Sequence, residues 1–357
     1  MTGPAESFFL IMSRTFSPPL RGLFCGAGHF AKIQLDAWRA VPDARIVALY
    51  NRTLDRAQLM QAEFGIEAIS ADMDALLDST RPDFVDICTA VETHLPLVRA
   101  AAARGLPVLC QKPLTARIAD SEELVAVCAA GKSRLMANEN WRWQGWYREL
   151  RRLIDTGAIG APRHARFVQR PGDGAEEEPY PLQPFFRDME RFLVLEVGGH
   201  YFDTMSYLLG PIESLHATLR RRNLRIRGED AALVSLEFAD GVTGVFDADR
   251  TACTEKVRSP VNGNAFIEGE HGNLRLDENG AIFIQRRGAR EERHAYDLPP
   301  GYRGGSAVAA QRHFIEKLRT GSPFETEGRD YLAIERAVDA CYRSAVSGAT
   351  VRLKATS

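Results

Sequence analysis

Along the first part of the chain, apolar runs of strand length alternate with amphipathic stretches of helix length. Strands that alternate with helices indicate βαβ units and a mostly parallel sheet covered on both faces. We therefore expect a doubly wound α/β domain over residues 21–138. Its predicted strands are Gly22–Cys25, Arg45–Tyr50, Phe84–Thr89, Pro107–Cys110 and Ser133–Ala137, and its predicted helices are Ala31–Ala40, Leu54–Phe64, Thr93–Arg104 and Ser121–Ala130.

The pattern changes after Asn138, and the chain from about Ile212 to Arg287 reads mainly as strands. Apolar and polar residues alternate there with a period of two, as in Val234–Phe238. The dipeptide Asp240-Gly241 is typical of a hairpin turn. Residues 139–357 are therefore predicted to form an α+β domain with a large, mostly antiparallel sheet. Its predicted helices are Trp146–Asp155, Ser306–Arg319 and Asp330–Val346.

The helices of this second domain are able to cover only one face of its sheet. We expect the other face, with residues such as Phe246 and Ile284, to be open. A large exposed sheet face usually marks an interface, and closed symmetric assemblies are the common outcome. The pattern thus predicts a homodimer or a homotetramer.

Composition narrows the class of protein without naming it. Apolar residues make up 45% and charged residues 26% of the 357 residues, and the net charge is −2. These values are ordinary for a soluble globular protein and lack the basic excess that nucleic-acid binding requires. Six scattered cysteines without a C-x-x-C pair indicate reduced core residues and a cytoplasmic location. Residues 1–20 are predicted to be a loosely ordered leader, since the apolar run Phe8–Met12 is too short for a membrane span.

A glycine-rich turn follows the first predicted strand. Gly26, Gly28 and Ala31 form the pattern G-x-G-x-x-A at a strand-to-helix junction. In such a turn the first glycine permits the tight bend, the second lets a pyrophosphate approach the backbone, and the small third residue lets helix and strand pack closely. The N–H groups at the start of the helix then face the phosphates. We therefore expect Gly26, Gly28, His29, Phe30 and Ala31 to bind a dinucleotide.

The residues after the second strand bear on the choice of cofactor. An acid at this point binds the ribose 2′-hydroxyl of NAD, whereas a nearby arginine accommodates the 2′-phosphate of NADP. The chain has Asn51, Arg52 and Thr53 here and no acid. This combination favours NADP, and NAD held through Asn51 stays open as the alternative.

Two further clusters carry polar groups suited to catalysis. Gln111, Lys112 and Pro113 follow an apolar strand, at the sheet edge where ligands bind in open α/β folds. Far downstream, Glu196, His200 and Asp203 fall at i, i+4 and i+7, which places them on one face if the stretch is helical. A metal site is not expected, because no second His or Cys lies at ligand spacing.

The order of these motifs resembles the Gfo/Idh/MocA family, named for glucose–fructose oxidoreductase, inositol dehydrogenase and rhizopine catabolism. The resemblance runs from about Gly22 to Leu353 and includes a glycine hairpin at Gly269–Leu274. Two positions depart from the family pattern. Gln111 stands where the family has glutamate, and Glu196 stands where it has aspartate. The substrates of the best-known inositol or glucose members are therefore not assigned directly to this chain.

The resemblance implies an NAD(P)-dependent oxidoreductase that moves hydride between nicotinamide C4 and a carbinol carbon of a sugar, polyol, inositol or related hydroxy compound. It implies His200 as the acid/base group, since its unperturbed pKa lies near ~6.5. Lys112 is expected to orient the hydroxyl and stabilise the developing alkoxide, or to share the proton with His200. Glu196 is expected to orient His200 or to bind a neighbouring hydroxyl.

The same resemblance extends the predicted binding residues. Thr89, His94, Gln111 and Lys112 are expected beside the cofactor. The stretch 138–147 joins the two predicted domains, and clefts between domains are preferred ligand sites. Asn140, Arg142 and Asp203 are therefore expected to contact the substrate.

Some members of this family act as cofactor-sensing regulators, and others use the cofactor for non-redox cleavage of glycosides. The presence of both Lys112 and His200 argues against a pure sensor. The dehydrogenase interpretation is favoured, and these two functions remain its alternatives.

Overall fold

A computed structural model describes residues 19–181, 183–253 and 259–353, so residues 1–18 of the predicted leader lie outside the described residues. The chain divides into two compact units. Unit 1 comprises the chain up to Asn138 together with Ala307–Arg329, and unit 2 comprises Glu139–Ser306 together with the chain from Asp330 onward. The segment Ala307–Arg329, which the sequence pattern placed in the second domain, instead packs with unit 1.

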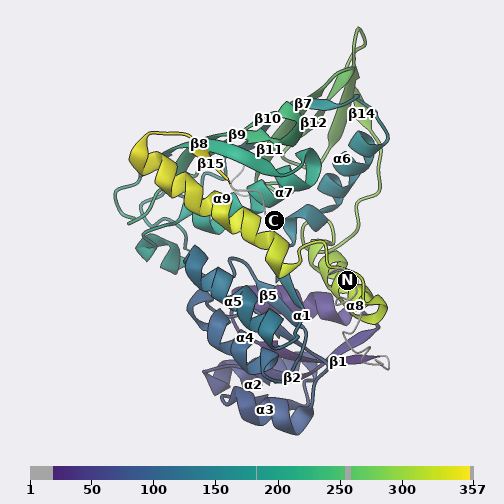
Figure 1. Ribbon diagram of the computed structural model, residues 1–357, viewed down its shortest axis with the longest axis vertical. Helices are drawn as coiled ribbons and strands as arrows, with labels where there is room; N and C mark the ends of the chain where they lie inside the picture. Colours follow the sequence, from purple (N-terminus) through teal and green to yellow (C-terminus); the bar gives the residue numbers. More distant parts are fainter. Residues whose placement is uncertain (1–18, 182, 254–258, 354–357) are drawn as a thin grey trace, which may run out of the picture. The chain divides into compact units, whose positions relative to one another are not determined.

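Unit 1 is built on a parallel six-stranded sheet, as the alternating pattern predicted (Figure 1). The strand order is β3-β2-β1-β4-β5-β6, in which the chain starts at the centre, runs to one edge and then reverses to the other. β3 was not among the predicted strands, because three residues are too few to show a period. The strands are β1 Leu20–Cys25, β2 Ala44–Tyr50, β3 Ala68–Ser70, β4 Phe84–Ile87, β5 Val108–Gln111 and β6 Leu135–Asn138.

Helices cover both faces of this sheet. α3, α4 and α5 pack side by side on one face, where Arg104 Nε donates to Asp78 Oδ1 at 2.9 Å. On the other face α1 contacts α2 through the ion pair of Lys32 with Glu63. The helices are α1 His29–Arg39, α2 Leu54–Phe64, α3 Met73–Thr80, α4 His94–Ala102 and α5 Ile118–Ala130.

The returning segment completes unit 1. Gln311 of α8 (Ser306–Thr320) donates to Gln34 Oε1 of α1 at 2.8 Å, and Asn138 Nδ2 donates to the same oxygen at 3.2 Å. After α8 the chain runs along the edge strand β6, where Ala137 N donates to Thr326 O at 2.9 Å and Thr326 Oγ1 donates to Ala137 O at 2.6 Å. This segment therefore satisfies backbone groups that an edge strand leaves unpaired.

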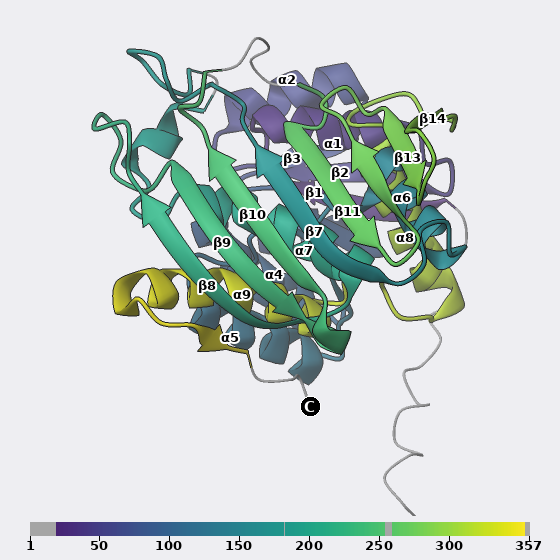
Figure 2. The same cartoon turned by 90° about the horizontal axis from the view of Figure 1, so that it is seen from above.

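Unit 2 is built on a nine-stranded sheet of order β14-β13-β12-β11-β7-β10-β9-β8-β15 (Figure 2). All of its strand pairs are antiparallel except β7 with β10, so the predicted mostly antiparallel sheet is confirmed. Asp240 and Gly241 both have positive φ, at 61° and 74°, in the tight turn that joins β9 to β10. The strands are β7 Pro162–Gln169, β8 Ile212–Arg220, β9 Ala231–Phe238, β10 Thr243–Asp249, β11 Gly263–Gly269, β12 Gly272–Leu276, β13 Ile282–Arg286, β14 Glu292–His294 and β15 Val351–Arg352.

One face of this sheet is covered by helices, and Figure 2 shows α7 and α9 behind it. The predicted helices of this unit are present, as α6 Gly145–Asp155 and α9 Gly328–Ser347, and α7 Gly199–Leu209 lies between β7 and β8 in the chain. Phe246 is fully buried on the covered face, 5.8 Å from the Phe202 ring of α7, and Ile284 is buried opposite Leu274.

The assignment of Phe246 and Ile284 to the open face is therefore wrong. A period of two identifies two faces without telling which one the helices cover. The open face carries the opposite set, including Leu233 at 52% exposure and the half-buried Val245 and Phe266.

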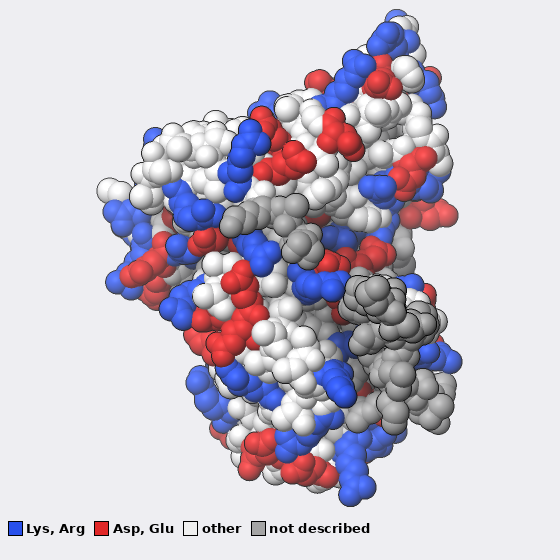
Figure 3. Space-filling view, in the orientation of Figure 1, with Lys and Arg blue, Asp and Glu red and all other residues white. Residues whose placement is uncertain are grey.

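Charged side chains of both signs are interspersed over the described surface drawn in Figure 3. This mixture agrees with the near-zero net charge of the sequence. Among the described residues, no helix has the length and apolarity needed to cross a membrane.

Candidate functional site

The turn after β1 has the geometry that a dinucleotide fingerprint requires. Gly26 has φ +116°, and a Cβ placed there would lie 2.2 Å from the carbonyl oxygen of Cys88. Only glycine fits this position. A Cβ on Gly28 would meet nothing within 4 Å, so the backbone there is open to an approaching group. Ala31 is fully buried where α1 packs on the sheet.

These residues fit a dinucleotide. α1 begins at His29 directly after Gly28, so its first N–H groups lie beside the open backbone at Gly28, an arrangement suited to an anion. The first turn of α1 contains no acid that would repel a phosphate. Gly26, Gly28, His29, Phe30 and Ala31 would hold the pyrophosphate.

The end of β2 carries Asn51, Arg52 and Thr53. Asn51 N donates to Ser70 O at 3.2 Å, and its side-chain amide donates to Thr53 O at 2.6 Å. Arg52 and Thr53 are exposed at this carboxyl end of the sheet. An exposed guanidinium beside an amide, with no acid in the tripeptide, is compatible with either ribose form.

The His94 ring lies between two loops of unit 1. It is buried at the start of α4, and its ring nitrogens lie 3.0 Å from Leu114 O and 3.2 Å from Thr89 O. Burial lowers the pKa of His94. The imidazole thus joins the loop after β4 to the loop after β5. Thr89 Oγ1 lies 2.7 Å from Thr93 Oγ1 in the same loop.

Lys112 directly follows β5, and its backbone N–H donates to Oε1 of Gln111 at 3.0 Å. Gln111 thereby uses its amide oxygen to fix the backbone at Lys112. A glutamine does this without adding a negative charge beside the ammonium group. The lysine stands at the carboxyl edge of the parallel sheet, where its position in the sequence predicted it.

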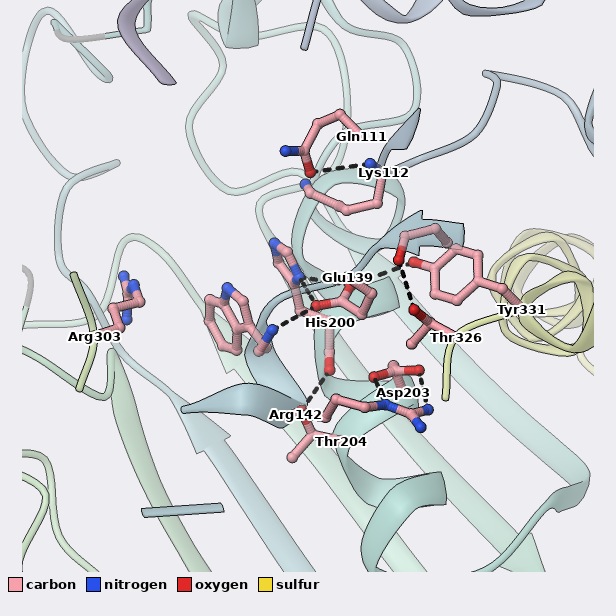
Figure 4. Close-up of polar contacts among 12 residues, drawn as sticks. Gln111, Lys112, Glu139, Arg142, His200, Asp203, Thr204, Arg303, Thr326 and Tyr331 are labelled. Atoms are coloured by element: carbon pink, nitrogen blue, oxygen red, sulfur yellow. Dashed lines mark hydrogen bonds and ion pairs between the residues drawn. The ribbon is translucent and has the colours of Figure 1, made fainter. Parts of the chain in front are cut away.

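In unit 2, His200 is bonded to a carboxylate that sequence reasoning missed. Nδ1 of His200 lies 2.7 and 2.8 Å from the two oxygens of Glu139 (Figure 4). Glu139 is fully buried and also accepts the backbone N–H of Trp141 at 2.9 Å and the hydroxyl of Tyr331 at 3.3 Å. The indole of Trp141 stacks on the imidazole, with ring centroids 4.4 Å apart and planes 9° from parallel. Four contacts therefore fix Glu139 and His200 in one orientation.

Glu139 was detectable only through its position. It is the first residue after the buried strand β6, and an acid there needs a partner to be buried. No spacing rule links it to His200, because the two residues are 61 positions apart.

Glu196 does not share a regular helix with His200 and Asp203. Val194–Gly198 forms a π-helical turn, and the regular helix α7 begins only at Gly199. The wider turn rotates Glu196 away from the position that 3.6-residue spacing predicts, and such turns often occur at functional sites. Glu196 is half-buried on this turn.

The start of this π-helical turn is held by Glu229 and Tyr342. The Glu229 carboxylate accepts N–H groups from Phe192 at 3.2 Å and from Val194 at 3.0 Å. Tyr342 donates its hydroxyl proton to Glu229 at 2.7 Å and accepts the N–H of Leu195 at 3.1 Å. Side chains thus replace the missing intrahelical partners at this helix start.

The predicted substrate residues Arg142 and Asp203 bind each other. Arg142 Nε donates to Asp203 Oδ2 at 2.8 Å and its NH2 donates to Oδ1 at 2.5 Å, with Asp203 fully buried. Burial raises the pKa of Asp203 to about 6, and the Arg142 guanidinium opposes this rise. This bidentate pair holds the turn Trp141–Trp143 against α7. The predicted residue Asn140 is buried beside Glu139.

The described residues contain no group of three or more His, Cys, Asp or Glu side chains able to hold a metal ion. Within unit 2, an imidazole and a carboxylate in direct contact are groups suited to proton transfer. Lys112 belongs to unit 1.

Comparisons with known proteins agree with the fold. Residues 20–139 match the "Oxidoreductase family, NAD-binding Rossmann fold", and residues 147–275 match the "GFO/IDH/MocA C-terminal domain". A D-apiose dehydrogenase of Paraburkholderia graminis is 34% identical over 94% of this chain and 90% of its own length. A myo-inositol 2-dehydrogenase of Thermotoga maritima is 26% identical over 85% of this chain and 90% of its own.

A solved structure of another oxidoreductase has the same fold. The oxidoreductase from Agrobacterium radiobacter in complex with NAD⁺, L-tartaric acid and magnesium superposes with a TM-score of 0.87 at 32% identity, covering 94% of this chain and 98% of that one.

The protein is therefore an NAD(P)-dependent dehydrogenase that acts on CH–OH groups. The chain belongs to the Gfo/Idh/MocA oxidoreductase family.

Proposed function

We propose that the enzyme oxidises a carbinol of a small polyhydroxylated compound with His200 as the general base. The contact between Glu139 and Nδ1 of His200 carries this proposal. A carboxylate on Nδ1 keeps the ring proton on that nitrogen, so Nε2 has the lone pair that accepts the hydroxyl proton. The buried carboxylate then stabilises the imidazolium that forms. In the reverse direction Nε2 returns the proton.

The other catalytic roles follow from charge. The Lys112 ammonium stabilises the alkoxide that develops as the hydroxyl loses its proton. Glu139, and not Glu196, orients His200. Glu196 therefore has the other role expected for it, which is to bind a neighbouring hydroxyl of the substrate. Arg142 and Asp203 act mainly by positioning the segment that carries Glu139 and Trp141. When bound, the nicotinamide supplies the hydride acceptor at C4.

For the cofactor, we propose a preference for NADP over NAD. Arg52 is exposed at the end of β2, no acid stands in Asn51–Thr53, and the Thr53 hydroxyl makes no cap bond to α2. A 2′-phosphate would gain a guanidinium partner at this position. NAD bound through Asn51 is the alternative, and the relative that holds NAD⁺ supports it.

The substrate is proposed to be a sugar, polyol or sugar acid of small size. A relative with 34% identity is a D-apiose dehydrogenase, and another relative was solved with L-tartaric acid. Both compounds are short, hydroxylated carbon chains. We further propose a cytoplasmic homodimer or homotetramer, supported by five buried cysteines and by the uncovered sheet face with Leu233, Val245 and Phe266.

The purified protein is tested with NADP and NAD against a panel of aldoses, polyols, inositols and aldonates while absorbance of the reduced nicotinamide is followed. Reduction of the cofactor with at least one member, lost in His200→Ala, is the expected result. A protein that binds the cofactor yet reduces it with no compound, and instead releases aglycone from a glycoside without net redox, would replace this proposal with the glycosidase alternative. Light scattering at micromolar concentration tests the assembly, and a monomer would contradict it.

A further inference from the structure

A guanidinium lies beside the aromatic ring that stacks on the acid/base histidine. Arg303 Cζ lies 5.0 Å from the ring centroid of Trp141, whose indole is 4.4 Å from the imidazole of His200 (Figure 4). The three residues belong to one unit of the chain. None of the roles assigned above to His200, Glu139 or Lys112 uses this cation.

Neutral oxygens hold Arg303 in place. Its Nε donates to the hydroxyl of Tyr302 at 3.1 Å, and its NH1 donates to the carbonyl of Pro260 at 2.5 Å. When the amide of Asn262 is oriented so that its nitrogen donates to Ser259 O at 2.9 Å, its oxygen accepts from the NH2 of Arg303 at 2.7 Å. A guanidinium has five N–H groups, so these three bonds leave two for another acceptor.

No carboxylate within the described ranges forms an ion pair with Arg303. The positive charge of Arg303 acts on neighbouring groups. Burial raises the pKa of both Tyr147 and Tyr201, and Arg303 opposes this rise. Tyr201 lies in α7 directly after His200, and its ring packs edge-on against Trp141 at 5.1 Å. A half-buried cation with only neutral partners gains most from an anionic ligand.

We propose that Arg303 binds a carboxylate of the substrate, which makes the enzyme a dehydrogenase of hydroxy acids of the aldonate class. This inference rests on the proposed function, because it places the oxidised carbinol at His200. The distances of 5.0 Å from Arg303 Cζ and 4.4 Å from the imidazole to the Trp141 ring centroid put the two groups no more than 9.4 Å apart. At about 1.5 Å per bond, a hydroxy acid of roughly four to six carbons has a matching length. The planar guanidinium fork matches the two oxygens of a carboxylate.

The reaction on such a substrate balances without a further reactant. The carbinol C–H bond breaks as hydride leaves to the oxidised cofactor, and the hydroxyl proton goes to Nε2 of His200. The product is a keto acid, whose carboxylate keeps its contact with Arg303 throughout. The arginine therefore contributes to the binding of substrate and product alike. Its removal is expected to raise KM more than it lowers kcat.

Matched pairs of ligands test the proposal. L-Threonate is compared with threitol and D-gluconate with sorbitol, since each pair differs in one carboxylate. In the wild type we expect kcat/KM for the acid to exceed that for the polyol by at least about 10-fold. Arg303→Gln should lower the value for the acid by about 10- to 100-fold, the range for hydrogen bonds to a charged group, and change that for the polyol less than about 3-fold. Arg303→Lys keeps the charge and loses the planar guanidinium. Its kcat/KM for the acid should lie between the values of the wild type and of Arg303→Gln.

Arg286→Gln is the control, because Arg286 is an exposed arginine of β13 in the same unit. It should leave all four substrates unchanged. Equal use of acids and polyols by the wild type, or equal losses for both in Arg303→Gln, would overturn the carboxylate site.

Binding separates this inference from the proposed function. With the enzyme saturated with reduced cofactor, calorimetric titration of L-threonate measures affinity without turnover. Binding that is lost in Arg303→Gln and kept in Arg286→Gln supports the carboxylate site even if none of the four compounds is oxidised. Oxidation of sugars or polyols without any measurable binding of either acid supports the proposed function and refutes the carboxylate site.

Discussion

Glu139 and His200 form a buried acid–imidazole pair in which both carboxylate oxygens lie within 2.8 Å of Nδ1. The backbone N–H of Trp141 and the hydroxyl of Tyr331 hold the carboxylate from two further directions. Such an acid restricts the imidazole to the tautomer with the proton on Nδ1.

Glu139→Gln is expected to lower kcat by about 10²-fold or more with little change in cofactor affinity. The glutamine amide is able to donate to Nδ1, which moves the ring proton to Nε2 and removes the lone pair that accepts the substrate proton. Steady-state kinetics over a range of pH measures this effect. Tyr331→Phe removes only the 3.3 Å bond and serves as the control, with an expected change below about 3-fold. Normal turnover in Glu139→Gln would exclude the proposed role.

Lys112→Ala and His200→Ala should each lower turnover by about 10²-fold or more, since positioned acid–base groups contribute roughly 10²–10⁴. If both residues act on one hydroxyl, the double variant should be little worse than the worse single variant. Cofactor affinity, followed by fluorescence of the reduced nicotinamide, should change much less. Fully multiplied losses in the double variant would show that the two residues act in separate steps.

Gly26→Ala and Gly28→Ala separate folding from binding at the fingerprint. Alanine at Gly26 brings a Cβ within 2.2 Å of Cys88 O at φ +116°, so the free energy of unfolding should fall by more than about 2 kcal/mol. Alanine at Gly28 meets nothing within 4 Å, so stability should change by less than about 1 kcal/mol. Cofactor affinity of Gly28→Ala should still fall at least about 10-fold, because the methyl group occupies the approach of the pyrophosphate. Unchanged affinity would place the pyrophosphate elsewhere.

Arg52→Ala should weaken NADP by about 1.5–3 kcal/mol, the scale of a hydrogen bond to a charged group, and scarcely affect NAD. Dissociation constants for both cofactors measured on the same preparation decide this. A wild type that prefers NAD tenfold, or a variant that loses both cofactors equally, would contradict the proposed preference.

Asp86→Asn should change how stability depends on pH. Asp86 is fully buried in β4, where its Oδ2 accepts the indole N–H of Trp38 at 2.7 Å. Burial raises the pKa of Asp86 from its ordinary 3.8 to about 7. The folded state therefore keeps a proton that the unfolded state has lost between these values, and stability falls as pH rises across that window. At 1.36 kcal/mol per pKa unit, the span is at most about 4 kcal/mol.

Because the variant lacks the titratable group, its free energy of unfolding relative to that of the wild type should increase from about pH 4 to pH 7. Urea unfolding curves measure this difference. Asp297→Asn, at an exposed position, is the control and should show no such trend. A difference between Asp86→Asn and the wild type that is independent of pH would mean that Asp86 is ionised in the folded protein throughout.

The parts of the site that obey a local rule were predictable from the sequence. Gly26, Gly28 and Lys112 lie at strand ends, and the alternation of strands and helices places strand ends at one edge of the sheet. Glu139 escaped prediction because its partnership with His200 depends on tertiary packing across 61 residues. The expected helical face with Glu196 required regular 3.6-residue spacing, which the π-helical turn interrupts.

The open face of the sheet shows a different limit. Alternation in Val234–Phe238 and its neighbours correctly predicts two unlike faces, but the residues named for the outer face, Phe246 and Ile284, lie on the inner one. A single strand contains no information on which set contacts a helix.

The path of the chain has a consequence for how the protein is made. Unit 1 begins at the N-terminus, but the segment that supplies Gln311 to α1 and Thr326 to the β6 edge comes from residues 307–329. A ribosome must therefore translate nearly the whole of unit 2 before the nucleotide-binding unit has all of its parts. A nascent chain that ends near residue 138 has an uncovered strand β6 and lacks the Gln311 partner of Gln34, so a fragment cut there is expected to expose an unpaired sheet edge rather than to behave as an independent domain.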